Sequence, residues 1–92
     1  MPGEPIIFHW DPEDDPDGNW QHVFEGHDVE PEEVEAFIDH YWHVRGARVD
    51  RPDGSSIIVG TSDTGRTLKA VFEILDRDPP RVRVFTCYPI GV

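Results

Sequence analysis

The strongest pattern in the chain is EPEEVEAFIDHYW, residues 30–42. Glu30 can act as the N-cap of a helix, Pro31 suits the first helical position, and the glutamates that follow complement the positive end of a helix dipole. Apolar side chains then recur at the spacing i, i+3, i+4, i+7 and i+8, and they are Val34, Phe37, Ile38, Tyr41 and Trp42. This spacing predicts a helix of about 12 residues with one apolar stripe, which needs a second layer to pack against.

The sequence after this helix is typical of strands separated by turns rich in Pro, Asp and Gly. The predicted strands cover residues 43–50, 55–61, 67–75 and 81–88. Before the helix, the sequence predicts a first strand over 6–10, an acidic loop over 11–18 and a short helix over 19–25.

Loop lengths and element order together indicate the fold class. Because short loops join antiparallel neighbours, we expect one α+β domain over residues 1–92, with residues 1–5 and 89–92 as loose termini. One or two helices would pack on a mostly antiparallel sheet of roughly four to five strands.

Strict alternation sorts the side chains of the last two predicted strands onto two faces of the sheet. The face toward the helix is expected to carry Leu68, Ala70, Phe72, Ile74, Val82, Val84 and, as a further candidate, Tyr88. The opposite face is expected to carry Lys69, Glu73, Arg81, Arg83, Phe85 and Cys87. Lys69, Arg81 and Arg83 would then form a small basic patch, with Arg66 near its edge. The alternative is a solvated face whose charges oppose aggregation.

Charge is distributed unevenly along the 92-residue chain, whose formal net charge is −11 and whose isoelectric point is about 4.6. Residues 1–40 hold 13 Asp and Glu and no Lys or Arg, whereas residues 41–92 hold 6 Asp and Glu and 8 Lys and Arg. The acidic part is expected to pack against the basic part, to bind a partner, or to remain a solvated surface. This net charge argues against a general binder of nucleic acids or anionic membranes, which would repel the chain.

Cysteine content and hydropathy indicate where such a chain is expected to work. Cys87 is the single cysteine, so no intramolecular disulfide is expected, and a reducing cytoplasm suits the chain. No stretch approaches about 18 consecutive apolar residues, so we expect no membrane span. A cytoplasmic domain without a membrane partner is therefore predicted.

Histidine spacing raises the question of a metal site. His40 and His43 lie at i and i+3 at the predicted helix end, and Asp39 or His27 could complete a ligand set. No fixed spacing ties further ligands to this pair, and histidines near a helix C-terminus commonly serve as solvated or capping groups. We therefore predict no metal and no cofactor.

Metal-independent RNA cleavage is one chemistry that the predicted basic patch could support. It requires cations that hold the phosphate and stabilise its developing charge, together with a general acid or base. Arg66, Lys69, Arg81 and Arg83 could supply the cations, and His27 could supply the acid or base.

Four motifs stand in the order and spacing of the BrnT-type toxins of bacterial type II toxin–antitoxin systems, which this chain resembles over about residues 8–88. Phe8–Asp11 is similar to that family's opening Phe-x-Trp-Asp, and Gly26–Glu33 to its Lys-His-Gly-Val/Ile-Ser-Phe-Glu-Glu. Gly65–Val71 is similar to its Gly-Arg-x-Leu-x-Val-Val strand, and Arg81–Thr86 to its Arg-Ile-Arg-Ile-Ile-Ser.

The resemblance implies a RelE-like fold, a metal-independent ribonuclease activity and an antitoxin partner. On this hypothesis His27, Arg66 and Arg83 have catalytic roles. Lys69 and Arg81 would bind the RNA substrate.

The chain departs from that family at two of its motifs. Gly26 stands where the family has a lysine, and Thr86-Cys87-Tyr88 stands where it has Ser-Ala-Arg. The two missing cations leave an alternative function from another class, a non-catalytic module whose acidic half binds a basic protein.

Overall fold

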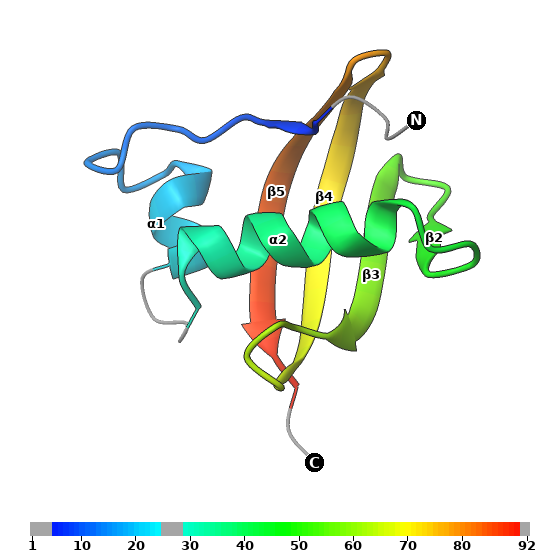
Figure 1. Cartoon of the computed structure of the whole chain (residues 1–92). Helices are drawn as coiled ribbons and strands as arrows, with labels where there is room; N and C mark the ends of the chain where they lie inside the picture. Colours follow the sequence, from blue (N-terminus) through cyan, green and yellow to red (C-terminus); the bar gives the residue numbers. More distant parts are fainter. Residues whose placement is uncertain (1–4, 25–28, 91–92) are drawn as a thin grey trace.

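The computed structural model describes residues 5–24 and 29–90, and this part of the chain folds into two helices and five strands (Figure 1). In chain order the elements are β1 (Ile7–Phe8), α1 (Asn19–Phe24), α2 (Pro31–Trp42), β2 (Arg48–Asp50), β3 (Ser55–Thr61), β4 (Thr67–Arg77) and β5 (Pro80–Pro89). The sheet order is β1-β5-β4-β3-β2, with β1 parallel to β5 and every other pair antiparallel. The predicted α+β class, with helices on a mostly antiparallel sheet, is confirmed.

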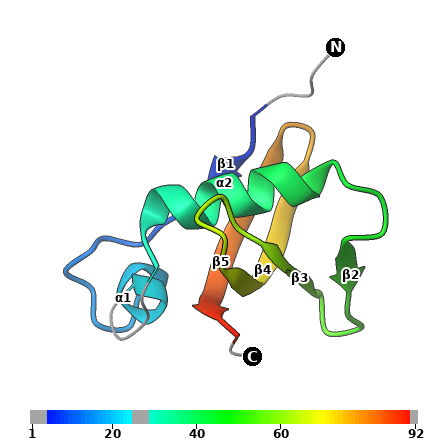
Figure 2. The same ribbon diagram turned by 60° about the horizontal axis from the view of Figure 1, so that its bottom comes forward.

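Helix α2 crosses one face of the sheet, and α1 lies beside it next to β5 (Figures 1 and 2). The predicted start is confirmed, since Glu30 has an extended backbone with φ −106° and ψ 152° and Pro31 opens the helix. The Glu30 side chain makes no capping hydrogen bond, so the first-turn glutamates remain the charges that complement the helix dipole. Neither helix in the described part of the chain has the length and apolar character that a membrane span requires.

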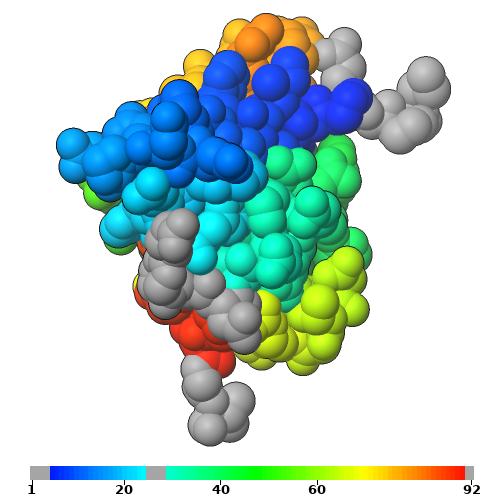
Figure 3. Space-filling view, turned by 90° about the vertical axis from the view of Figure 1, so that its left-hand side faces the viewer, coloured from blue at the N-terminus to red at the C-terminus, as the bar shows by residue number. Residues whose placement is uncertain are grey.

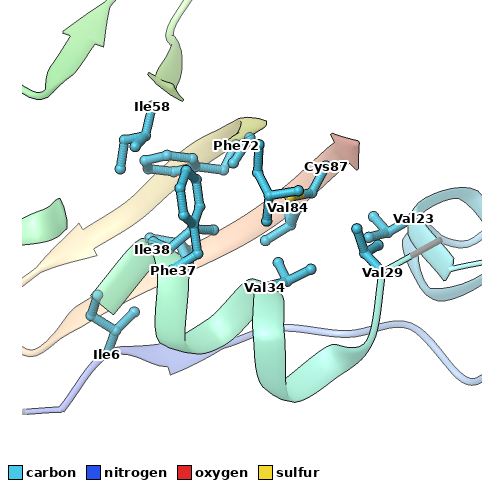
Figure 4. Close-up of a cluster of buried hydrophobic side chains, with 13 residues drawn as sticks. Ile6, Val23, Val29, Val34, Phe37, Ile38, Ile58, Phe72, Val84 and Cys87 are labelled. Atoms are coloured by element: carbon cyan, nitrogen blue, oxygen red, sulfur yellow. The ribbon is translucent and has the colours of Figure 1, made fainter. Parts of the chain in front are cut away.

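The core forms between α2 and the sheet, as the apolar stripe predicts. Val34, Phe37 and Ile38 are buried, and they face strand residues such as Phe72 and Val84 (Figure 4). Every inward residue predicted on β4 and β5 from 68 to 84 is buried, except Ile74, which is half-buried. Tyr41 and Trp42 pack against the edge of this core. Burial of a stripe of this kind stabilises the fold by about 1.5–3 kcal/mol per large side chain.

The predicted outward position of Cys87 is wrong, because β5 contains a bulge. Phe72 pairs with Val84 and Val71 pairs with Thr86, so Phe85 is an extra residue without a partner on β4. One inserted residue moves every later side chain to the other face. Cys87 therefore points into the core, where it is fully buried (Figure 4). Tyr88 turns to the outer face, opposite Lys69.

The first part of the predicted strand 43–50 is also wrong, since β2 covers only Arg48–Asp50. Residues 43–47 form turns instead, in which the amides of Val44 and Ala47 donate to the carbonyls three residues earlier. Gly46 allows this path, because its φ of +82° lies in a region that side chains with a Cβ rarely adopt. At the other end, β5 continues to Pro89 and the Ile90 amide donates to the Thr67 carbonyl, so the chain stays paired through residue 90.

Candidate functional site

The two arginines to which catalysis was assigned are both paired with carboxylates from the acidic half. Arg66 Nη2 donates to Glu33 Oε1 at 2.6 Å. Arg83 Nη2 donates to Asp11 Oδ2 at 2.7 Å. The expectation that the acidic part packs against the basic part therefore holds at these two points.

Glu33, in the first turn of α2, is the centre of a buried polar cluster. Only 6% of its surface is exposed, and besides Arg66 it accepts hydrogen bonds from Ser62 Oγ at 3.0 Å and Thr64 Oγ1 at 2.6 Å. Burial alone would raise the pKa of Glu33, but the bonds from Arg66, Thr64 and Ser62 outweigh it and lower the pKa below its usual value. The cluster ties the start of α2 to the turn between β3 and β4.

Asp11 is the equivalent link at the other edge of the sheet. Its Oδ2 accepts from the backbone amide of Asn19 at 2.8 Å as well as from Arg83. The buried Asn19 side chain returns the contact by accepting from the Asp11 amide at 2.7 Å, and its Nδ2 donates to the carbonyls of His9 and Val84. These bonds hold the start of α1 against β5, so the Arg83–Asp11 pair is part of a structural joint.

The remaining predicted cations do not gather with Arg66. Lys69 and Arg83 share the outer face, but the β4 partner of Arg83 is Glu73, four residues or about 13 Å along the strand from Lys69. Arg81 lies two residues, about 7 Å, from Arg83 on that face. Arg66 is bound to α2 on the other side of the sheet, and His27 lies outside the described residues.

A hollow of about 410 Å³ brings Arg83 together with a histidine that sequence reasoning missed. The lining residues are Pro16, Asp17, Gly18, Asn19, His22, Arg83 and Phe85. His22 is on α1 and Arg83 is on β5, so only the docking of α1 on β5 brings them to one place. An imidazole, a guanidinium and an exposed aromatic ring can hold a nucleotide, but Asp11 already neutralises Arg83 and Asp17 adds negative charge.

A groove between β1 and α2 combines an apolar floor with an acidic rim. It has a volume of about 390 Å³ and is lined by Pro5, Ile6, Phe8, Glu32, Glu35, Ala36 and Asp39. Glu35 Oε2 accepts from Trp10 Nε1 at 2.7 Å, whereas Glu32 and Asp39 are exposed. Figure 3 shows the acidic loop, α1 and α2 side by side on one side of the molecule. This arrangement suits a positively charged segment that also carries apolar side chains.

Chemistry at Cys87, His40 or His43 has little support in the described residues. Burial, reinforced by the nearby Glu33 carboxylate, raises the pKa of the Cys87 thiol to about 12, so it is not a nucleophile at neutral pH. His40 and His43 are exposed, and His40 lies edge-on against the Tyr41 ring at 4.8 Å. Among residues 5–24 and 29–90 no group of three or more His, Cys, Asp or Glu side chains is placed to hold a metal ion.

Comparison with known proteins adds no assignment. No protein-family model, no curated protein and no solved structure matches the chain. The resemblance to the BrnT-type toxins therefore stays a prediction from the sequence motifs, and function is argued below from the geometry alone.

Proposed function

We propose that this domain is a non-catalytic binding module that engages a basic protein segment in the groove between β1 and α2. The observation that carries the proposal is the groove itself, in which Phe8 and Ala36 form an apolar floor beside the exposed carboxylates of Glu32 and Asp39. A segment with lysine or arginine and an apolar anchor would match both features. On the toxin-family resemblance, this segment would belong to an antitoxin-like protein.

The state of the predicted cations supports the same proposal. RNA cleavage needs free positive charge around one phosphate. Arg66 and Arg83 instead neutralise Glu33 and Asp11, and they lie on opposite sides of the sheet. The surplus of carboxylates would repel a polyanion and attract a cationic partner, and this attraction weakens as salt rises.

The test is binding of a fluorescent 12-residue peptide of alternating lysine and leucine, measured by anisotropy at several salt concentrations. The Glu32→Lys/Asp39→Lys variant should weaken binding about tenfold or more, because it reverses both rim charges. The matched control is Glu13→Lys/Asp14→Lys, which makes the same charge change at exposed loop residues that do not line the groove. Equal losses in the two variants would mean unspecific attraction and would refute the groove as the site.

RNA cleavage is the second candidate, and the hollow that joins His22, Arg83 and Phe85 is the observation that favours it. Incubation of the purified protein with total RNA at low salt should leave the RNA intact if the binding proposal is right. Cleavage that is lost in both His22→Ala and Arg83→Ala, but kept in His43→Ala, would replace the binding proposal with a metal-independent ribonuclease.

A further inference from the structure

The face of the sheet opposite α2 is not covered by any described helix (Figures 1 and 2). We call this the outer face, and its apolar side chains remain partly or largely exposed. Val49 is 58% exposed and Val59 is 47% exposed, although both lie on strands inside a folded domain. Apolar side chains grouped on one open sheet face are typical of a protein-binding surface.

The strand register gathers part of this face into one row. Val49 pairs with Ile57, Ile57 pairs with Val71, and Val71 pairs with Thr86. Paired residues on neighbouring strands point to the same face, so these four side chains form a row across β2, β3, β4 and β5. The Phe85 bulge contributes to this alignment, because it turns Thr86 outward.

Charged residues flank this row symmetrically. Lys69 and Glu73 lie two residues before and two residues after Val71 on β4, so each is about 7 Å from the row, on the same face and on opposite sides of it. Within the described residues neither one forms an ion pair, and Arg83, the cross-strand neighbour of Glu73, donates to Asp11 instead. A positive and a negative charge at equal distances from a central apolar row make the face complementary to itself.

We propose that the occupant of the outer face is a second copy of this chain. The two copies are related by a twofold axis that is parallel to the row and lies midway between the two facing sheets. Rotation about this axis stacks the row on itself and reverses the direction along each strand. Lys69 of each copy then faces Glu73 of the other, and this opposition occurs twice. The assembly has two sheets in the middle and the helices outside.

The dimensions of two packed sheets fit this arrangement. Facing sheets lie about 10 Å apart, a gap that an extended lysine and an extended glutamate can bridge together. The usual angle of about 30° between packed sheets shifts the facing groups by about 4 Å at this distance from the axis, which two long side chains can absorb. Helix α2 lies on the other face of each sheet, away from the contact (Figures 1 and 2).

The area of the face indicates how strong the contact is. Strands β3, β4 and β5 each offer about seven residues and β2 offers only three, which gives a footprint of roughly 20 Å by 20 Å or less on each copy. This area is below that of a standard specific interface and corresponds to a weak, transient contact. We therefore expect dissociation in the micromolar range, so that the dimer forms reversibly with concentration.

The experiment is sedimentation equilibrium of the full chain from about 5 to about 500 μM, a range chosen to span micromolar dissociation. Wild type should change from monomer to dimer across this range. Lys69→Glu and Glu73→Lys should each raise the dissociation constant about tenfold or more, because each places two like-charged pairs across the axis. The double variant Lys69→Glu/Glu73→Lys restores the opposite charges and should return the dissociation constant to near the wild-type value.

Two comparisons separate this contact from general charge repulsion. Glu73→Lys lowers the net negative charge, so repulsion alone would predict a tighter dimer, whereas the proposal predicts a weaker one. Arg45→Glu makes the same charge change as Lys69→Glu at an exposed position after α2 and should leave the dissociation constant nearly unchanged. A wild type that stays monomeric at the highest concentration, or a double variant that fails to recover, would overturn the proposal.

Discussion

Replacing Glu33 with glutamine tests whether the buried cluster holds α2 to the turn between β3 and β4. The change keeps the shape of the side chain and removes its charge, so the charge-assisted bond from Arg66 at 2.6 Å is lost. Hydrogen bonds to charged groups contribute about 1.5–3 kcal/mol, and Arg66, whose side chain is 32% exposed, recovers part of this from water. The hydroxyls of Ser62 and Thr64 can still donate to the amide oxygen. We therefore expect the free energy of unfolding to fall by about 1–2 kcal/mol at neutral pH.

The stabilising contribution of Glu33 also depends on pH, and the direction of this dependence can be predicted. The pKa of Glu33 in the folded protein is lowered from its ordinary value of 4.5, so its stabilising contribution is present above about pH 4.5 and is lost as pH falls through the folded pKa. Glutamine does not titrate. The difference in unfolding free energy between wild type and Glu33→Gln should therefore shrink as pH falls from about 7 to about 3. Urea unfolding followed by tryptophan fluorescence at each pH measures this difference.

The matched control for this measurement is Glu32→Gln, the neighbouring and exposed position in the same helical turn. It makes the same chemical change and removes the same helix-dipole interaction, and it should lower the unfolding free energy by less than about 1 kcal/mol. Glu33→Gln that costs no more than this control, or a difference that stays constant down to low pH, would refute the assignment of a stabilising role to the cluster.

Three further substitutions or treatments test the packing. Phe37→Ala should lower the unfolding free energy by about 3–5 kcal/mol, measured by urea unfolding, because Phe37 is only 2% exposed; a loss below about 1 kcal/mol would contradict its place in the core. Cys87 should react with a thiol reagent only on unfolding, and rapid modification of the native protein would show that its thiol is not buried. Gly60→Ala should cost about 1–3 kcal/mol in thermal or urea unfolding, because a Cβ there would overlap the Tyr41 ring and displace a hydroxyl that donates to the carbonyl of Thr61 and accepts from its amide. An unchanged midpoint for that variant would mean that the ring moves freely.

Local patterns in the sequence were sufficient for most of the secondary structure. The spacing of Val34, Phe37 and Ile38 predicts both the length of α2 and the face that it buries. The turn sequences likewise predict the start of β3 and β4, because Pro-Asp-Gly and Asp-Thr-Gly disfavour continued strands. What these patterns could not predict is the irregular pairing between strands.

The Phe85 bulge is the clearest example of such an irregularity. Without it, alternation would carry Thr86 inward and Cys87 outward, and a threonine hydroxyl would have to find a partner in an apolar core. The bulge places the more apolar Cys87 inside and Thr86 on the outer face. Only the balance of burial over both strands favours this register, so a rule that reads one strand at a time predicts the wrong face.

For the candidate site, the sequence predicted the charged residues but not which of them pair with each other. The partners in the Arg66–Glu33 pair are separated by 33 positions in the sequence, and those in the Arg83–Asp11 pair by 72 positions. Nothing in the local sequence selects one carboxylate from the 13 in the first 40 residues. His22 was missed for the same reason, since its place beside Arg83 depends on how α1 docks on β5. Charge content can be read from a sequence, but charge pairing follows from topology.

The pattern of pairing bears directly on function. Glu33 and Asp11 hold elements together by their hydrogen bonds, and each has an arginine partner from the second half of the chain. Glu35 also makes such a link, by accepting from Trp10. Exposed carboxylates such as Glu32 and Asp39 form no comparable link between described elements, although Glu32 adds a helix-dipole interaction, and concentrated like charge opposes the compact state by self-repulsion. Folding therefore does not account for the acidic rim of the groove between β1 and α2. A cationic partner does, because it would neutralise this rim and cover the apolar floor in a single contact.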